Sequence, residues 1–307
     1  MSQIVLKTDH ACKTYGKFAA VSDLDFQVKE GEIYALVGQN GAGKTTLLKM
    51  ICGLAPLSSG MLELFGCSSE KELEHGRRKI GCMIETPGFF PYLSAEENLE
   101  YYRIQRGTKE KDCVKKALET AGIADTGRKK FRNFSLGMKQ RLGLALAVMD
   151  GPEFLVLDEP INGLDPMGIR DFREIILRLN RESGTTVLIS SHILGELSQI
   201  ATTYGFIHQG RLIETVSAEN LKEKCRSRLR LEVDDAQKAA SVLAASTPCR
   251  DIERKDETTL SVGDGLDHPE LLVKALVEHR VMVMQSYRCG ISLEQYFLNL
   301  IGGEKSA

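Results

Sequence analysis

Residues 38–45 form a glycine-rich segment that ends in a lysine and a threonine. The segment reads Gly38-Gln-Asn-Gly-Ala-Gly43-Lys44-Thr45, which matches the spacing G-x-x-x-x-G-K-[ST]. Glycines let backbone N–H groups turn toward a phosphate chain, while the lysine supplies positive charge and the threonine a hydroxyl ligand for Mg²⁺. An apolar run precedes the segment and a helical pattern follows it, as this motif requires. The predicted phosphate-binding residues are Gly38, Gln39, Asn40, Gly41, Ala42, Gly43, Lys44, Thr45 and Thr46, with Thr45 also a metal ligand.

Two acids, Asp158 and Glu159, end the apolar run 153–160. A pair of this kind is usually a turn or the cap of a helix, but beside a phosphate site it needs balancing positive charge. Mg²⁺ and Lys44 would provide that charge. We therefore expect Asp158 to hold Mg²⁺, through water, and Glu159 to be the general base for an attacking water.

His192 ends the next apolar run, 185–192. A single histidine at such a place is more often a core or loop residue. At the edge of a phosphate-binding sheet, it is a candidate catalytic residue that donates to the γ-phosphate or positions Glu159 and water.

Ser135 and Gly137 open an apolar helical pattern that runs to about Met149. A serine is a good N-cap, and its hydroxyl together with the first N–H groups of the helix forms an anion site. An ordinary capped helix is the plain alternative. The presence of a phosphate loop upstream and a pair of acids downstream favours the anion site.

The elements that position these residues alternate between strands and helices as far as about residue 215, which predicts an α/β fold with a mainly parallel sheet. Pro166 suits the first turn of a helix to about Glu182, and Gly184 suits its end. Residues 90–150 predict helix after helix, so we expect a helical insert. Residues 204–214 predict a hairpin that turns at Gln209-Gly210.

The composition changes near residue 220. From there we predict strand 229–233, helix 236–245, strands 251–256 and 258–262, helix 268–279, strand 281–287 and helix 292–301. The chain is thus expected to have one domain over 1–220 and a small α+β accessory domain of ferredoxin-like type over 221–307.

The overall composition is that of an ordinary globular protein, with 42% hydrophobic and 27% charged residues. A net charge of −2 gives no electrostatic reason to expect nucleic acid as a partner. The eight cysteines show no zinc or disulfide spacing, so reduced thiols in a cytosolic protein are expected. No apolar run approaches the roughly 18 residues of a spanning helix, and we expect any membrane pathway to belong to another polypeptide.

Taken together, the motifs resemble the nucleotide-binding subunit of ATP-binding cassette (ABC) transporters over about residues 4–220. "GQNGAGKTT" looks like the Walker A motif and "FLVLDEP" like Walker B. "FSLGM" is similar to the signature motif, "NGLD" (162–165) to the D-loop, and His192 to the switch histidine. Tyr15 resembles the aromatic residue that stacks on adenine. The resemblance implies that two such domains pair head to tail, so that each ATP lies between one Walker A and the Ser135 and Gly137 of a second subunit.

Two departures from the family pattern stand out. In the signature segment, Leu136 replaces the first glycine and Met138 the glutamine, which makes hydrolysis expected but leaves a clamp that only binds ATP as an alternative. Glu85 replaces the Q-loop glutamine. With Glu85, "LSAEENL" and "SLEQYFLNLIG", the chain resembles the antibiotic-peptide exporters of bacitracin and lantibiotic type.

The function that this resemblance implies is ATP binding and hydrolysis with Mg²⁺, in a homodimer that powers a separate membrane permease from the cytoplasmic face. Export of an antibiotic peptide or similar amphipathic compound is expected. A soluble ABC ATPase acting in translation or on chromosomes is the alternative, although neither a second cassette nor long coiled coils are visible. A P-loop GTPase would need an N-K-x-D motif, which we do not find.

Glu85 raises an electrostatic question of its own. Two like charges about 4 Å apart cost about 4 kcal/mol at an effective dielectric near 20, so Glu85 needs a cation if it approaches the γ-phosphate. It would ligate Mg²⁺, bind a cation of the partner, or swing away. Our hypothesis is that Glu85 reaches Mg²⁺ when the dimer closes on ATP, and that Thr86-Pro87-Gly88 is a hinge. The alternative is a solvated acid at a strand end.

Overall fold

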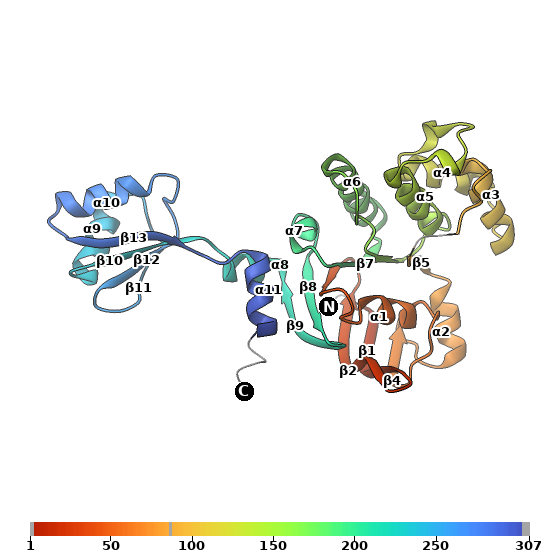
Figure 1. Ribbon diagram of the computed structural model, residues 1–307, viewed down its shortest axis with the longest axis horizontal. Helices are drawn as coiled ribbons and strands as arrows, with labels where there is room; N and C mark the ends of the chain where they lie inside the picture. The colour runs from red at the N-terminus through yellow and green to blue at the C-terminus, as the bar shows by residue number, and fades with distance from the viewer. Residues whose placement is uncertain (1–2, 86–87, 303–307) are drawn as a thin grey trace. The chain divides into compact units, whose positions relative to one another are not determined.

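The computed structural model describes residues 3–85 and 88–302 (Figure 1). The chain divides into two compact units, Met1–Ala218 and Glu219–Ala307. The division lies two residues before the boundary expected from the change in composition. The Thr86-Pro87 part of the expected hinge lies outside the described residues.

A six-stranded sheet forms the centre of the first unit, in the order β5-β6-β7-β3-β8-β9. Strands β5, β6, β7, β3 and β8 are parallel, and β9 is antiparallel to β8. All five residues of β3 are buried, as expected for a strand covered on both faces. The β8–β9 hairpin turns at Gln209 and Gly210, both with positive φ, which confirms the predicted turn. The bounds are β3 (Ile33–Val37), β5 (Ile80–Met83), β6 (Phe154–Asp158), β7 (Thr186–Ser191), β8 (Thr203–His208) and β9 (Arg211–Ser217).

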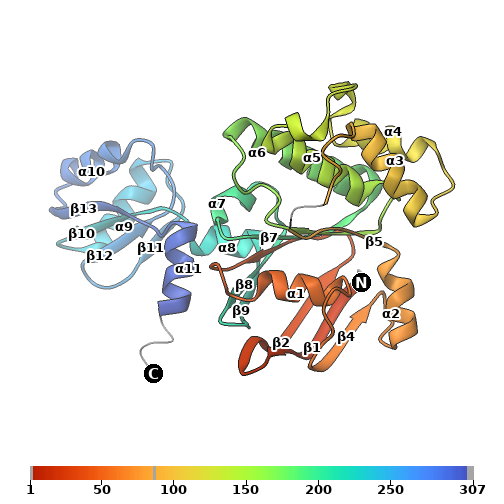
Figure 2. The same ribbon diagram turned by 45° about the vertical axis from the view of Figure 1, so that its right-hand side comes forward.

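A separate antiparallel sheet, which the sequence analysis did not predict, has the order β2-β1-β4. Its strands are β1 (Ile4–Tyr15), β2 (Phe18–Lys29) and β4 (Ser59–Leu64). The helix α1 (Lys44–Ile51) lies between this sheet and the six-stranded one (Figure 2). One core cluster joins the three layers, with Leu6 and Phe26 from the antiparallel sheet, Leu47 from α1 and Val156 from β6. Burial on both sides therefore holds α1 against the end of β3.

Helices cover the rest of the first unit. Ser135 accepts a hydrogen bond from the N–H of Met138 and caps α5, as predicted, and Pro166 opens α6 behind the N-cap Asp165. Gly184 ends α6 with a φ of 66°. The helices are α2 (Glu70–Arg77), α3 (Ala95–Arg106), α4 (Asp112–Thr120), α5 (Leu136–Val148), α6 (Pro166–Ser183) and α7 (Leu194–Leu197), with 3-10 turns η1 (Ala124–Thr126) and η2 (Phe131–Asn133). Between β5 and β6 the structure therefore has the predicted run of helices, α3 to α5.

The second unit contains a four-stranded antiparallel sheet in the order β11-β12-β10-β13. Leu231, Leu260 and Val262 of the sheet pack against Leu243 of α9 and Leu276 of α10 in one core. From β10 to β13 the elements follow the strand-helix-strand-strand-helix-strand order that was predicted, and the predicted last helix follows as α11, whereas α8 was not predicted. The elements are α8 (Ala218–Lys224), β10 (Arg228–Val233), α9 (Ala236–Ser246), β11 (Ile252–Arg254), β12 (Thr259–Val262), α10 (Pro269–Glu278), β13 (Val283–Cys289) and α11 (Leu293–Gly302).

Candidate functional site

The loop 38–43 connects the carboxyl end of β3 to the start of α1. A Cβ on Gly38 would lie 2.5 Å from the carbonyl oxygen of Ile207, so only glycine fits there. Gly43 has a φ of 108°, and a Cβ there would lie 2.5 Å from the carbonyl oxygen of Ala20. Gln39, Asn40 and Gly41 are exposed, Ala42 is buried, and Thr46 is half-buried in the first turn of α1. The backbone therefore forms an exposed turn whose N–H groups precede a helix N-terminus, which is the arrangement that binds phosphate.

Lys44 is the first residue of α1 and its side chain is only 5% exposed. Its Nζ donates to the carbonyl oxygens of Gly38 at 2.7 Å and Gln39 at 3.2 Å. The same Nζ lies 3.1 Å from Oε1 of Glu159. The lysine is thus held against the loop by three oxygens, one of them a carboxylate, and a phosphate bound in the loop would compete for the same ammonium group.

Thr45, Asp158 and Ser190 form a chain of hydrogen bonds across three elements. The Thr45 hydroxyl donates to Oδ2 of Asp158 at 2.7 Å, and the Ser190 hydroxyl donates to Oδ1 at 2.6 Å. Ser190 is fully buried and its oxygen also accepts from the backbone N–H of Glu159 at 2.9 Å. Ser190 was not among the residues predicted from the sequence. Its position two residues before His192, on the strand next to β6, could have identified it as a site residue.

Glu159 follows β6 in a left-handed conformation, with a φ of 45°. This strained backbone directs its side chain between two cationic or polar groups, since Oε1 faces Lys44 and Oε2 accepts from Nδ1 of His192 at 2.5 Å. The structure therefore brings together five of the predicted site residues: Lys44, Thr45, Asp158, Glu159 and His192. A carboxylate that is oriented at both oxygens suits a base that must be precisely placed.

Tyr15 ends β1 and is 51% exposed, with the Nζ of Lys13 located 5.0 Å from its ring centroid. It pairs with Phe18 across the β1–β2 hairpin. The same hairpin approaches the phosphate loop, because the carbonyl oxygen of Ala20 borders Gly43. An exposed aromatic ring thus lies on the hairpin that borders the loop.

Ser135 and Gly137 lie in the other part of the candidate site, at the start of α5. They line a cavity of about 530 Å³ together with Asp165 and Gly168. Leu136, which departs from the family pattern, is half-exposed, and its side chain packs toward Gly163. Within residues 3–85 and 88–302, no hydrogen bond or ion pair joins Ser135 or Gly137 to the phosphate loop.

Glu85 has a φ of 60°, and its side chain is 64% exposed. Its Oε1 lies 2.6 Å from Nζ of Lys49, in the last turn of α1. The hydrogen bond to Glu85 is the main cause that raises the pKa of Lys49. The cation beside Glu85 in this structure is thus a lysine of its own chain, which the sequence analysis did not consider.

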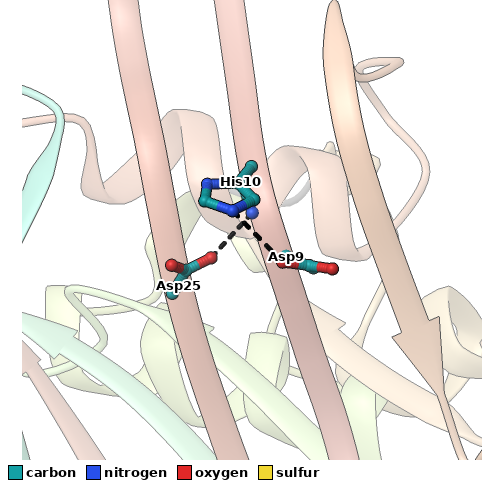
Figure 3. A group of neighbouring side chains, drawn as sticks. All are labelled: Asp9, His10 and Asp25. Atoms are coloured by element: carbon teal, nitrogen blue, oxygen red, sulfur yellow. Dashed lines mark hydrogen bonds and ion pairs between the residues drawn. The ribbon is translucent and has the colours of Figure 1, made fainter.

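A second polar group lies on β1 and β2 (Figure 3). The backbone N–H of His10 donates to Oδ1 of Asp25 at 2.7 Å, and Nδ1 lies 2.6 Å from Oδ1 of Asp23. Oδ1 of Asp9 lies 3.8 Å from Nε2 of His10. The bond to Asp23, followed by the charges of Asp25, Asp23 and Asp9, raises the pKa of His10. These contacts form an exposed group of ion pairs that connects β1 to β2.

Comparisons with known proteins agree with this geometry. Residues 21–162 match the family model described as ABC transporter. The chain is 40% identical over 301 residues to the bacitracin transport ATP-binding protein BcrA of Enterococcus faecalis, with 98% of this chain and 97% of that protein covered. It is 39% identical over 232 residues to the lantibiotic transport ATP-binding protein SrtF of Streptococcus pyogenes, with 74% and 99% covered.

Among solved structures, the dimeric ATP-binding cassette MJ0796, in a post-hydrolysis state bound to ADP and Pi, has the same fold. The TM-score is 0.63 at 24% identity, and the alignment covers 69% of this chain and 98% of that one. With the phosphate loop, the paired acids and the full-length relatives all in agreement, the chain belongs to the ABC transporter family and is an ATPase subunit that binds and hydrolyses ATP.

Proposed function

We propose that this subunit powers the export of an antibiotic peptide, or a similar amphipathic compound, through a separate membrane permease. The observation that carries the proposal is the 40% identity to a bacitracin transport ATP-binding protein along 98% of this chain, because that alignment includes the second unit as well as the cassette. The presence of Glu85 in place of the glutamine that is usual in the family supports the same assignment. A soluble cassette acting in translation or on chromosomes is not favoured by these relatives.

We infer the catalytic roles from the contacts around Glu159. Glu159 takes the proton of the attacking water, and His192 holds its carboxylate from the second oxygen. Lys44 and the N–H groups of the loop bind the β- and γ-phosphates, while Tyr15 stacks on adenine. Ser190 is a positioning residue, because its hydroxyl fixes Asp158 and the backbone of Glu159 at once.

Mg²⁺ fits the pair formed by Thr45 and Asp158. The hydroxyl and the carboxylate lie 2.7 Å apart, beside the phosphate loop, and both are oxygen ligands of the kind that Mg²⁺ prefers. Held there by Thr45 and Asp158, Mg²⁺ would supply positive charge against the negative charge that develops on the phosphates. We keep Glu85 as a further ligand that reaches the metal only after it leaves Lys49.

The working form is proposed to be a head-to-tail homodimer. Ser135 is exposed and Gly137 is half-buried at the N-terminus of α5, and no contact in the described part of the chain joins them to the phosphate loop of the same subunit. A second copy would place them on the γ-phosphate, where the Ser135 hydroxyl and the helix N-terminus favour negative charge. We propose that residues 1–220 form the ATP-binding domain and that residues 221–307 form an accessory domain of ferredoxin-like type.

The permease is proposed to bind an apolar patch made of Phe90, Tyr92, Tyr101 and Ile104. Tyr92 is 69% exposed and Ile104 is 64% exposed. The rings of Phe90 and Tyr101 pack edge to face, with 4.6 Å between the ring centroids. Exposed aromatic groups of this kind anchor protein interfaces. In the described residues, no helix has the length and apolar character needed to cross a bilayer, and attachment to the inner face of the membrane is proposed to occur through this patch.

The test is to purify the tagged full chain from the membrane fraction of its source organism and to identify the proteins that accompany it. We expect a polytopic membrane protein, and we expect the pair to raise resistance to bacitracin or a lantibiotic when both are expressed. A Lys44→Ala chain should still bring down the membrane protein but give no resistance. Recovery with ribosomes or DNA in place of a membrane protein would refute the transporter function.

A further inference from the structure

Two thiols, Cys52 and Cys82, face each other between α1 and the edge strand β5. Cys52 is the C-cap residue of α1 and Cys82 lies inside β5. Each thiol shifts the pKa of the other, which indicates that the two sulfurs lie close together. Cys82 is exposed and Cys52 is half-buried, and both are free thiols.

The pleat of β5 explains why these two residues meet. A Cβ on Gly81 would lie 2.1 Å from the carbonyl oxygen of Ala147, so Gly81 faces α5. Neighbouring residues of a strand point to opposite faces, so Ile80, Cys82 and Ile84 face the other side. Ile80, Ile84 and Cys52 all pack against the core cluster that contains α1. The contact between the thiols therefore follows from the register of β5 on α1.

A second contact joins the same two segments. Lys49 and Cys52 are three residues apart on α1 and so lie on one face of the helix. Cys82 and Glu85 are likewise three residues apart, and Glu85 binds Lys49 at 2.6 Å. A covalent bond between the thiols would thus link two segments that already touch at a neighbouring position.

The chemistry of the pair is asymmetric. The hydrogen bond with Cys52, assisted by the charge of Arg106, lowers the pKa of Cys82 to about 7. The same bond, together with burial, raises the pKa of Cys52, so the Cys52 thiol keeps its proton. Burial is also the main cause that raises the pKa of Cys113, Cys225 and Cys249. An exposed thiolate beside a second thiol is the arrangement on which peroxide acts most readily.

We propose that Cys82 and Cys52 form a peroxide-oxidisable dithiol, with Cys82 as the attacking thiolate and Cys52 as the resolving thiol. In the first step the Cys82 sulfur bonds one oxygen of hydrogen peroxide and the O–O bond breaks, which gives a sulfenic acid and a hydroxide that is protonated to water. In the second step the Cys52 sulfur attacks the Cys82 sulfur, the S–O bond breaks, and the departing hydroxide takes the Cys52 proton. Two thiols lose two electrons and peroxide is reduced to two waters.

The disulfide would connect the helix that carries Lys44 and Thr45 to the strand that leads to Glu85. Glu85 follows Cys82 by three residues, so oxidation would keep its backbone close to Lys49. This inference rests on the thiol geometry alone and does not depend on the identity of the transported compound or of the permease.

The experiment treats the purified full chain with hydrogen peroxide, alkylates the remaining thiols, and identifies cross-linked peptides by mass spectrometry without reduction. We expect loss of two of the eight free thiols, one peptide that joins Cys52 to Cys82, and complete reversal by dithiothreitol. In Cys52→Ser, or Cys52→Ala if serine destabilises the half-buried site, dimedone should label Cys82 and no cross-link should form. Cys67→Ser is the matched control and should cross-link like wild type.

A separate measurement follows alkylation of reduced protein against pH. We expect the rate at Cys82 to reach half its maximum near pH 7, and we expect this midpoint to shift upward in Cys52→Ala, which leaves no side-chain donor at position 52. Folded wild-type protein that gives no Cys52–Cys82 peptide, or in which dimedone labels other cysteines while Cys82 stays unlabelled, would overturn the proposal.

Discussion

Nζ of Lys49 lies 2.6 Å from Oε1 of Glu85, so the acid that follows β5 has its counterion on the helix of the phosphate loop. Lys49 is four residues after Thr45 and shares its face of α1. The charge of Asp158 also contributes to the raised pKa of Lys49, which shows that the ammonium lies within the field of the proposed metal site. Lys49 therefore competes with any metal for the carboxylate of Glu85.

This competition predicts that substitutions of Glu85 and of Lys49 have opposite effects on the Mg²⁺ dependence of ATP hydrolysis. Glu85→Gln and Glu85→Ala should raise the Mg²⁺ concentration for half-maximal rate about fivefold, because one net polar contact is worth about 1 kcal/mol. Lys49→Met should lower it, because Glu85 is released. Thermal stability should fall by less than about 1 kcal/mol in each variant, since both side chains are partly exposed. If the ATPase rate depends on Mg²⁺ concentration in both Glu85 variants as in wild type, Glu85 is not a metal ligand and pairs only with Lys49.

Replacement of Glu159 by glutamine should stop hydrolysis while ATP binding and dimerisation persist. The amide keeps the shape of the side chain but cannot take a proton, so we expect kcat to fall about 10² to 10⁴-fold. Steady-state ATPase assays, fluorescent-nucleotide binding and gel filtration with ATP measure the three properties. Glu153→Gln is the control, because Glu153 precedes the same strand and pairs with Lys79. Equal turnover in Glu159→Gln would remove this residue from its role as base.

His192→Ala should lower kcat by about 100-fold and leave the KM for ATP nearly unchanged. The imidazole holds only one oxygen of Glu159, while the phosphate loop that binds ATP keeps its contacts. His208→Ala, at the end of β8, is a matched control. If kcat is retained in His192→Ala, then Lys44 and Ser190 are sufficient to position Glu159.

The structure brings predicted site residues together where those residues are neighbours in the sequence. Lys44 and Thr45 follow one another at the start of a helix, and Asp158 and Glu159 follow one another at the end of a strand. The order of the strands in the sheet then brings the two pairs together. Ser190 was missed because a serine in an apolar strand gives no signal until the adjacent strand is known. Lys49 was missed because its partner lies 36 residues away, and no local pattern relates the two.

The fold also was predictable where it depends on local sequence patterns and was not where it depends on distant segments. The apolar runs of β3, β6 and β7 predict buried parallel strands, and the structure has them. The strands β1 and β2 alternate buried and exposed positions, which is the pattern of a sheet covered on one face. The pairing of β1 with β4 joins segments far apart in the chain. That long-range pairing, which creates the second sheet over α1, is not visible in the sequence pattern.

The pKa of His10 should lie above 6.5, because Nδ1 of its ring lies beside Asp23 and the carboxylates of Asp25 and Asp9 are near. Figure 3 shows His10 with Asp9 and Asp25. Since the folded pKa is raised, the stabilisation by the His10 group is present below about pH 6.5 and is lost as pH rises through the folded value. Titration of the imidazole C–H signals by NMR measures the midpoint. Asp23→Asn should shift it down, while Asp150→Asn, whose carboxylate binds Arg106, should leave it unchanged. Equal midpoints in wild type and Asp23→Asn would contradict the assignment.

Truncation of the apolar patch should separate permease binding from ATP hydrolysis. Tyr92→Ala and Ile104→Ala remove side chains that are mostly exposed, so the stability and the ATPase rate of the isolated chain should change little. Interface anchors are worth about 2 kcal/mol or more, which is a loss of about 30-fold in affinity for each. Recovery of the membrane protein with the tagged chain should therefore fall sharply. Tyr287→Ala, an exposed tyrosine of the second unit, is the control. If recovery is unchanged in the Tyr92 and Ile104 variants but lost in the control, the permease binds the second unit instead.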